Sequence, residues 1–363
     1  MTLLHVAAGN AYGGIERMLV TLASTAHPAV RQEFAVSFGG RLEQELREAG
    51  VVVHRLPSPR ASRPLMIWRA RRAFMAMQAK AAPDVTIFHS AWPHAMFAGT
   101  ARAGGARLCF WQHQPITTPA WPDRWARFVR PDVAVFNSRF TEARPAFPAV
   151  PGRVIHCAVA GPPAVSPDER RSLRASLGAG DDHVVVLMAA RFERWKGHEV
   201  LLRAAKLLPE STPIRIWIAG ASPASGSRYA NELAAAASEL GHRVSMLGER
   251  DDVPTLMRLA DVYCQPNLKG EPFGIAIAEA MRAGLPCVVS AGGGAAELLD
   301  ESCGVIVAPG DAEGIADALR RLAADPEARR AIGEAAERRA SELTDPAGRI
   351  RELFDVLSCP QPS

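Results

Sequence analysis

The sequence predicts an α/β protein with two domains, each built around a parallel sheet. Short apolar runs rich in Val, Ile and Leu alternate with longer amphipathic stretches through all 363 residues, as in chains of βαβ units. This length suits two domains of roughly 150–200 residues each. A stretch rich in Pro and Gly, 158–167, separates the two halves and is typical of a linker.

In the first half, strand and helix signals alternate from the first residues. The apolar run 2–8 is too short for a signal peptide and lacks a basic lead, so it predicts the first strand. The other strands of this half are predicted at 34–38, 51–56, 84–88, 107–111, 132–136 and 153–156. Amphipathic stretches between them predict helices at 15–26, 41–49, 64–80 and 92–103.

The second half repeats this alternation after the linker. Strands are predicted at 183–189, 214–219, 243–247, 261–264, 286–289 and 304–307. Helices are predicted at 197–207, 228–240, 252–259, 274–283, 294–299 and 311–324. Near the end, Ile350, Leu353, Phe354 and Leu357 recur at helical spacing and predict a tail helix. We therefore expect an N-terminal domain at 1–163, a C-terminal domain at 164–343 and a tail at 344–363.

Composition excludes several classes of protein. With 48% hydrophobic and 22% charged residues, the chain is an ordinary globular protein, and no apolar run approaches the ~18 residues of a membrane span. Its six cysteines are scattered without a Cys-x-x-Cys pair, which disfavours a disulfide framework and a zinc site. We expect reduced thiols, a cytoplasmic protein and no nucleic-acid partner.

Two glutamates lie in the most informative motif, the run GEPFGIAIAEAM at 270–281. Its early Pro and Gly predict a loop entering a helix, with Glu271 in the loop and Glu279 inside the helix. A helix start offers unpaired N–H groups and a partial positive charge, so Phe273, Gly274 and Ile275 are expected to hold a diphosphate. Glu271 would then meet a group beyond the phosphate, and Glu279 a hydroxyl on the nucleoside side. The alternative is a pair of glutamates on a solvated helix face.

Two cations follow the first strand of the second half, in the run ARFERWKG at 190–197. Arg191 and Lys196 lie on one strand-to-helix loop, so both can converge on one anion, with Arg giving a forked contact and Lys a point charge. Arg194 has the same charge and ranks below these two. No Asp-x-Asp metal motif occurs at a fitting place.

The first half contributes a glycine pair and a histidine. Gly13 and Gly14 separate the first strand from the first helix, where small residues let a backbone approach a ligand; the alternative is a tight turn. His113 ends the strand at 107–111, and His89 ends the strand before it. His94 and His156 are expected to be structural or surface groups.

Together these motifs resemble the family-4 retaining glycosyltransferases, the glycogen-synthase-like group with the GT-B fold. The match comprises Glu-x-Phe-Gly, a second Glu after seven residues, Ala-Gly-x-Pro, a strand and Gly-Gly-x-x-Glu at 293–297. The resemblance spans nearly the whole chain, is strong from about 184 to 310 and is thin in the acceptor-facing regions. Gln114 stands where the family usually has Gly, Asp or Thr. The resemblance implies two Rossmann-like domains facing across a cleft, with the tail returning to the N-terminal domain.

The resemblance also implies roles. Arg191 and Lys196 would bind the donor diphosphate and replace a metal, so no cofactor is expected. Glu271 would bind donor-sugar hydroxyls, Glu279 the ribose, and Gly13 and Gly14 would face the diphosphate. His113, ahead of His89, would lie beside the reacting sugar carbon. The expected activity is retaining, metal-independent transfer from a nucleoside diphosphate sugar, with a UDP-sugar favoured.

Charge suggests the acceptor. Residues 1–165 hold 19 Lys and Arg against 9 Asp and Glu, which favours an anionic partner, although a general Arg bias would give the same excess. The segment 63–74 is a basic amphipathic helix candidate containing Trp68, and its more ordinary interpretation is a surface helix packed on the sheet. We expect a glycan or lipid-linked acceptor in polysaccharide or glycolipid synthesis, with peripheral membrane contact as an open hypothesis.

Three alternatives remain open from the sequence. The first is natural-product glycosylation with a soluble small-molecule acceptor. The second is a nucleotide-sugar 2-epimerase on the same fold, which would release nucleoside diphosphate without an added acceptor. The third is a catalytically silent binding protein, against which the intact glutamate and cation pairs argue.

Overall fold

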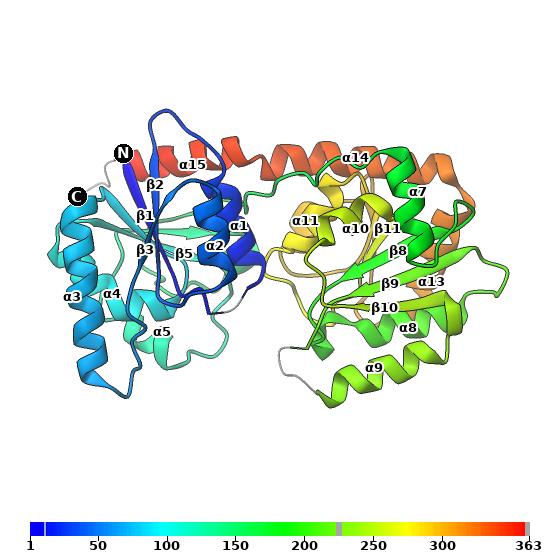
Figure 1. Cartoon of the computed structure of the whole chain (residues 1–363), viewed down its shortest axis with the longest axis horizontal. Coiled ribbons are helices and arrows are strands. Elements are labelled where there is room, and N and C mark those ends of the chain that lie inside the picture. The colour runs from blue at the N-terminus through cyan, green and yellow to red at the C-terminus, as the bar shows by residue number, and fades with distance from the viewer. Residues whose placement is uncertain (11, 223–226, 360–363) are drawn as a thin grey trace. The chain divides into compact units, whose positions relative to one another are not determined.

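The computed structural model describes residues 1–10, 12–222 and 227–359 and divides into two compact units. The first unit comprises Met1–Ala158 together with the chain from Thr344, and the second comprises Val159–Leu343. Each unit contains one parallel sheet with helices packed against it, the Rossmann-like arrangement predicted from the alternating pattern (Figure 1). The extended segment that joins the units lies within the Pro- and Gly-rich stretch identified from the sequence.

The first unit has a seven-stranded sheet in the order β3-β2-β1-β4-β5-β6-β7. The strands are β1 (Thr2–Ala7), β2 (Arg31–Val36), β3 (Val52–Arg55), β4 (Val85–Phe88), β5 (Arg107–Gln112), β6 (Val133–Phe136) and β7 (Gly152–Val154). Every strand predicted for this half is present, with ends shifted by a few residues. Because the chain places β2 and β3 on one side of β1 and β4 on the other, the carboxyl ends of β1 and β4 lie at a topological switch point.

The predicted helices of the first unit are α1 (Gly14–Ala23), α2 (Arg41–Glu48), α3 (Pro64–Ala81), α4 (Ala91–Ala103) and α15 (Pro346–Ser358). The short helices α5 (Trp121–Ala126) and α6 (Arg139–Glu142) were not predicted. Helices α3 and α4 pack on one sheet face through a core that includes Phe74, Phe88 and Phe97 (Figure 1). Helix α15 contacts α1 and buries Ile350, Leu353 and Leu357.

Helix α3 matches the ordinary interpretation of segment 63–74 only in part. Its inward side chains, among them Ala70 and Phe74, pack on the unit as a surface helix should. Three large apolar side chains, Leu65, Trp68 and Met75, remain exposed on its outer side. The amphipathic pattern therefore provides one packed face and one that no described residue covers.

The second unit has a six-stranded sheet in the order β10-β9-β8-β11-β12-β13. The strands are β8 (Val184–Ala189), β9 (Ile214–Ala219), β10 (Val244–Gly248), β11 (Val262–Gln265), β12 (Cys287–Ser290) and β13 (Gly304–Val307). The sequence predicted all six. Here the switch point falls between β8 and β11, because β9 lies on the other side of β8.

The predicted helices of this unit are α8 (His198–Leu207), α9 (Arg228–Ser238), α10 (Val253–Leu259), α11 (Ile275–Arg282), α12 (Ala295–Leu298) and α13 (Ala312–Ala324). Figure 1 shows α8 and α9 on one face of the sheet and α10 and α11 on the other. Helices α7 (Pro167–Ser176) and α14 (Pro326–Thr344) were not predicted.

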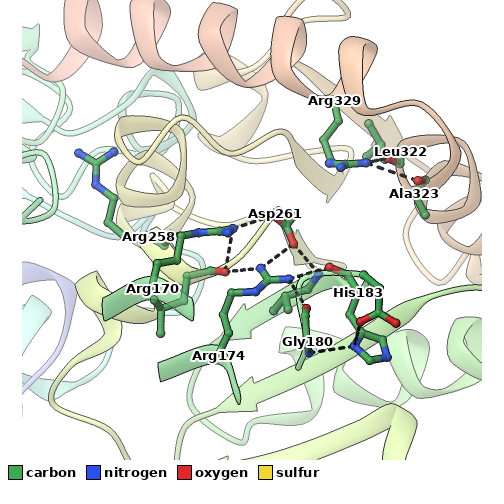
Figure 2. A network of polar contacts seen from close by, with 12 residues as sticks. Arg170, Arg174, Gly180, His183, Arg258, Asp261, Leu322, Ala323 and Arg329 are labelled. Atoms are coloured by element: carbon green, nitrogen blue, oxygen red, sulfur yellow. Dashed lines mark hydrogen bonds and ion pairs between the residues drawn. The ribbon is translucent and has the colours of Figure 1, made fainter. Parts of the chain in front are cut away.

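Helix α7 is held by a buried charge network at the edge of this core (Figure 2). The Asp261 carboxylate accepts hydrogen bonds from the guanidinium groups of Arg170 and Arg174, with N···O distances of 2.8 Å each. It also accepts one from the backbone N–H of Val185 at 2.8 Å. Arg174 is almost fully buried and donates further to the carbonyls of Gly180 and His183. One carboxylate thus ties α7 to the starts of β8 and β11.

Two further sequence expectations can be compared with the structure. All six cysteines are free thiols, five of them buried and only Cys359 exposed, as predicted. Among the helices of the described residues, none combines the length and apolarity that crossing a membrane requires.

Candidate functional site

A lysine and a glutamate from distant loops meet at the carboxyl edge of the second sheet. Lys196 ends a short 3-10 turn after β8, and Glu271 lies in the loop between β11 and α11. The Lys196 Nζ lies 2.6 Å from the Glu271 Oε2, and both side chains are largely buried. The same ammonium lies 4.0 Å from the centre of the Trp195 ring. The structure thus brings two of the predicted site residues together at the switch point between β8 and β11.

Two amides that the sequence analysis did not single out hold Glu271 in place. Gln265 Nε2 and Asn267 Nδ2 donate to the Glu271 Oε2 at 3.1 and 3.0 Å, beside the lysine. Tyr263 donates to the Gln265 Oε1 at 2.6 Å, and burial raises the pKa of this tyrosine well above its ordinary value. All contacts of the carboxylate use Oε2. Within the described residues, Glu271 Oε1 has no hydrogen-bond partner and can accept one from a ligand.

The loops around this pair depend on glycine. Gly197 has a left-handed φ of 80°, and a Cβ there would lie 1.8 Å from the carbonyl oxygen of Pro266. Gly293 has a φ of 72°, and its Cβ would lie 2.3 Å from the Glu271 carbonyl oxygen. The Gly294 N–H donates to that same carbonyl at 2.6 Å. The Lys-Gly and Gly-Gly pairs of the sequence motifs therefore allow the loops after β8, β11 and β12 to pack closely.

The two arginines of the first loop differ in their surroundings. Arg191 is more than half exposed and makes one ion pair, with Glu193 at 3.1 Å. Arg194 is bound by two carboxylates, Glu199 at 2.7 Å and Glu232 at 2.6 Å, and it lies over the Tyr229 ring. Arg194 is thus part of a surface network.

Helix α11 starts as the motif predicted. Gly274 caps it with a φ of 95°, and Ile275 is its first residue, so the first N–H groups of the helix have no partner within it. Phe273 is buried, so its ring packs inside the second unit. Glu279 lies in the second turn and is also buried.

In the first unit, the predicted glycine pair lies at the start of α1. Gly13 is the N-cap and Gly14 the first helical residue; Ala11 of this loop lies outside the described residues. Gly13 has an extended φ of −165°, which any residue adopts, and the nearest atom to a Cβ would be Glu16 Oε2 at 3.6 Å. Neither the backbone of Gly13 nor the described residues around it require glycine at this position.

His113 is one end of a row of three buried histidines. The row crosses adjacent strands: His5 on β1, His89 after β4 and His113 after β5. His5 Nδ1 lies 2.9 Å from His89 Nε2, and His89 Nδ1 lies 3.1 Å from His113 Nε2. His113 and His89 were predicted from their positions at strand ends, whereas His5 lies inside a strand and was not predicted.

The row is neutral and its protons are coupled. Burial lowers the pKa of His5 and of His113 to about 3, and it holds the pKa of His89 well below its usual value. Gln32 partly opposes this lowering of the His5 pKa, although the two side chains make no well-formed hydrogen bond. Each N···N contact holds one proton, so the three rings adopt their tautomers together. Whether the other ring nitrogen of His113, Nδ1, carries a proton therefore depends on the tautomers of His89 and His5.

The predicted site residues thus fall into two sets. Gly13, Gly14 and His113 belong to the first unit, whereas the cations and glutamates belong to the second. Across the described ranges, no three His, Cys, Asp or Glu side chains gather as a metal site would need. A groove of about 520 Å³ lies elsewhere in the first unit, between α3, α4 and α5, and none of the predicted site residues lines it.

Models of two glycosyltransferase families match this chain in sequence. Residues 169–339 match "Glycosyl transferases group 1", and residues 12–161 match "Glycosyltransferase Family 4". The first match includes Arg191, Lys196, Glu271 and Glu279, and the second includes Gly13 and His113.

Two relatives illustrate the similarity in sequence. A GDP-mannose-dependent alpha-(1-6)-phosphatidylinositol monomannoside mannosyltransferase of Mycolicibacterium smegmatis is 31% identical over 301 residues, which are 75% of each chain. A D-inositol 3-phosphate glycosyltransferase of Mycobacterium tuberculosis is 36% identical over 186 residues. That match covers 49% of this chain and only 38% of the relative.

Solved structures extend the similarity to the fold. HepE of Anabaena, in complex with UDP and glucose, has a TM-score of 0.85 at 22% identity and covers 99% of this chain and 100% of that one. Sucrose-phosphate synthase of Thermosynechococcus elongatus has a TM-score of 0.77 at 20% identity, covering 98% and 99%. Both agree with the GT-B fold expected from the sequence.

Proposed function

The chain belongs to the glycosyltransferases of group 1 and family 4, and from this premise we propose that it performs retaining, metal-independent sugar transfer from a nucleoside diphosphate sugar. The main support for this proposal is the hydrogen bonding of the Glu271 carboxylate. Its Oε2 accepts three donors, Lys196, Gln265 and Asn267, while Oε1 makes no hydrogen bond within the described part of the chain. A carboxylate held in this way, beside the start of α11, is set to accept hydroxyl groups of a donor sugar.

The diphosphate would bind to cations and backbone N–H groups. An ammonium has three N–H donors, so Lys196 can keep Glu271 and still donate to a phosphate oxygen. Arg191, with its single exposed ion pair, can turn to the same anion. The N–H groups at Gly274 and Ile275 add the partial positive charge of a helix start. These groups supply the charge stabilisation that a metal gives in other transferases.

Transfer with retention requires a front-face reaction in this proposal. The bond from the anomeric carbon to the leaving phosphate oxygen breaks as the acceptor hydroxyl oxygen bonds to that carbon from the same side. The hydroxyl proton passes to the departing phosphate oxygen, so no protein base is needed. Arg191 and Lys196 stabilise the charge that builds on the phosphate. Glu279 holds the ribose, and the neutral His113 offers a hydrogen bond beside the reacting carbon.

The other donor and acceptor details are also proposals. Gly13 supports a close approach of the diphosphate, because nothing among the described residues calls for glycine there. The basic N-terminal half and the two inositol-lipid and inositol-phosphate relatives support an anionic, lipid-linked or glycan acceptor at the inner membrane face. The base is open: one relative uses GDP-mannose by name, whereas the sequence analysis favoured UDP.

A ligand panel followed by product analysis tests the proposal. Thermal unfolding with UDP-, GDP-, ADP- and dTDP-sugars should show one base that raises the melting temperature, since ligands stabilise the folded state by mass action. With that donor and an inositol-lipid acceptor, NMR should find the product's anomeric configuration equal to the donor's. An inverted product would overturn retention, and stabilisation by none of the nucleotides would overturn the donor site.

A further inference from the structure

The first unit has an exposed surface whose chemistry differs from the rest of the molecule. Ten large apolar side chains are exposed among the described residues, and six of them lie on α3 or on and next to α5: Leu65, Trp68, Met75, Trp121, Trp125 and Phe128. Phe128 is the most exposed of these, at 85%. Single exposed apolar residues need no explanation, but a cluster of aromatic rings does.

A groove joins the two helices into one surface. It encloses about 520 Å³, with Arg71 and Met75 of α3 on one side and Trp125 and Phe128 on the other. Helix α4 forms its remaining wall and contacts both neighbours. Trp121 and Trp125 support each other edge to face, with ring centroids 5.2 Å apart. Trp121 and Trp125 are therefore held against each other on this surface.

Arginines surround these rings. Helix α3 contains no Asp or Glu, and its Arg69 and Arg72 are exposed, with the Arg72 guanidinium 5.4 Å from the Trp68 ring centre. At α5, Arg124 and Arg127 are exposed and make no side-chain hydrogen bond or ion pair within the described residues. The single acid of α5, Asp123, accepts the N–H of Ala120 at 2.8 Å. The surface is thus both apolar and cationic.

We propose that this aromatic–arginine surface (Leu65, Trp68, Arg69, Arg72, Met75, Trp121, Arg124, Trp125, Arg127 and Phe128) docks on a bilayer that contains anionic lipids. Indole rings favour the headgroup level of a bilayer, where their apolar body is buried and their N–H stays wet. Arginines can rest their stems on the apolar layer and direct their guanidinium groups to lipid phosphates.

Charge argues against the nearest alternative, a symmetric dimer through this face. A two-fold axis would bring the arginines of one copy against those of the other, and like charges in an interface are unfavourable. An anionic bilayer instead offers a counter-charge at every position. The docking surface deepens the proposed function by placing a lipid-linked acceptor near the protein, but its own test needs neither donor nor acceptor.

Vesicle flotation at low salt provides that test. The whole protein should bind vesicles of phosphatidylcholine with phosphatidylglycerol, should bind little to phosphatidylcholine alone, and should be released as salt is raised. Replacing Arg69, Arg72, Arg124 and Arg127 together by Gln should lower the partition coefficient between vesicles and water by about a hundredfold or more. Each charge near the surface contributes a factor of roughly five. Arg71 is left intact, because it donates to the Met96 carbonyl at 2.8 Å.

The matched control removes the same charge elsewhere. Arg320, Arg321, Arg330 and Arg338 are exposed on α13 and α14 of the second unit, and their joint replacement by Gln should leave flotation within about twofold. Equal losses of vesicle binding in both quadruple variants would show that net charge alone explains the binding, and would overturn the assigned surface.

A second pair of variants tests the rings. Trp125→Ser with Phe128→Ser should lower binding about tenfold, whereas Leu207→Ser with Val52→Ser, exposed elsewhere, should not. Brominated acyl chains should quench the fluorescence of the native protein. Absence of binding to anionic vesicles at low salt would overturn the proposal, as would concentration-dependent dimers lost in the Trp125/Phe128 variant. Donor-induced thermal stabilisation, measured in parallel, reports on the proposed catalytic site separately.

Discussion

The Lys196 ammonium and the Glu271 carboxylate lie 2.6 Å apart although 75 positions separate them along the chain. Both side chains are largely buried, so the pair is not an incidental surface contact. A paired cation and anion of this kind can each keep one partner and accept a second from a ligand. Their separate contributions are therefore measurable by single substitutions.

Replacement of Lys196 or Arg191 by Ala should lower kcat by about a hundredfold or more, because each removes a preorganised charge from the leaving phosphate. The fold should persist, since both lie in the connection between β8 and α8 and Glu271 keeps its two amide donors, Gln265 and Asn267, when Lys196 is removed. Arg194→Ala is the matched control: its guanidinium serves Glu199 and Glu232, so activity should change little. Steady-state kinetics on the purified variants give the answer, and equal effects at all three positions would argue against this division of roles.

Substitutions of the two glutamates, Glu271 and Glu279, should affect nucleotide binding and rate differently. Glu279→Gln should mainly weaken binding of the free nucleoside diphosphate, because a ribose contact is similar in the ground and transition states. Glu271→Gln should mainly lower the rate, because its proposed partner is the reacting sugar. Calorimetry with the nucleoside diphosphate separates the two effects, and the reverse order would show that the roles are exchanged.

Activity should persist in excess EDTA and should not rise on addition of Mg²⁺ or Mn²⁺. The reason is that Arg191, Lys196 and the start of α11 would supply the positive charge at the diphosphate. The initial rate before and after chelation measures this. A loss on chelation that Mg²⁺ reverses would contradict the metal-independent part of the proposal.

Removal of the Asp261 carboxylate should be strongly destabilising. Asp261→Ala leaves the buried Arg174 without its counter-charge, which costs about 3–5 kcal/mol in the free energy of unfolding. Asp317→Ala breaks the exposed pair with Arg320 and should cost less than about 1 kcal/mol. Denaturant unfolding compares the two. Similar losses would mean that the network of Figure 2 is no stronger than a surface pair.

The histidine row should make the protein sensitive to acid. The pKa of His113 is about 3 when folded, below the ordinary value of 6.5, so in this window the unfolded chain binds the extra proton. Stability should therefore fall as pH drops from about 6.5 toward 3, by about 1.4 kcal/mol per pH unit for this group. In His113→Asn this dependence of stability on pH should become weaker. Unfolding midpoints measured from pH 6.5 to 5 test this, and an unchanged slope in His113→Asn would contradict it.

The sheets were predictable because strand signals are local. Buried parallel strands read as short apolar runs between turns, and all thirteen were placed from the sequence. Helices α7 and α14 were missed because their inward residues are not the large apolar ones that periodicity detects. Arg174 is the buried residue of α7, and α14 buries Ala336 and Ala340.

The site was predictable only where it is contiguous in sequence. Glu271, Gly274 and Glu279 lie in one run, as do Arg191 and Lys196. Gln265 and Asn267 left only a weak signal in the sequence, which is two polar residues alternating at the end of a buried strand. That pattern does not indicate that both amides bind Glu271. His5, His89 and His113 become neighbours through the strand order β1-β4-β5, and no local pattern encodes that order.

The position of α15 has a consequence for how the chain is made. Its buried Ile350, Leu353 and Leu357 belong to the first unit, and Arg107 donates to the Leu357 carbonyl at 2.6 Å. The ribosome therefore releases the last part of this unit only after it has made the whole of the second one. Domains usually fold in order of synthesis, from the N-terminus. Here the unit that emerges first is expected to complete its folding last, with its α15 site open until that helix leaves the ribosome.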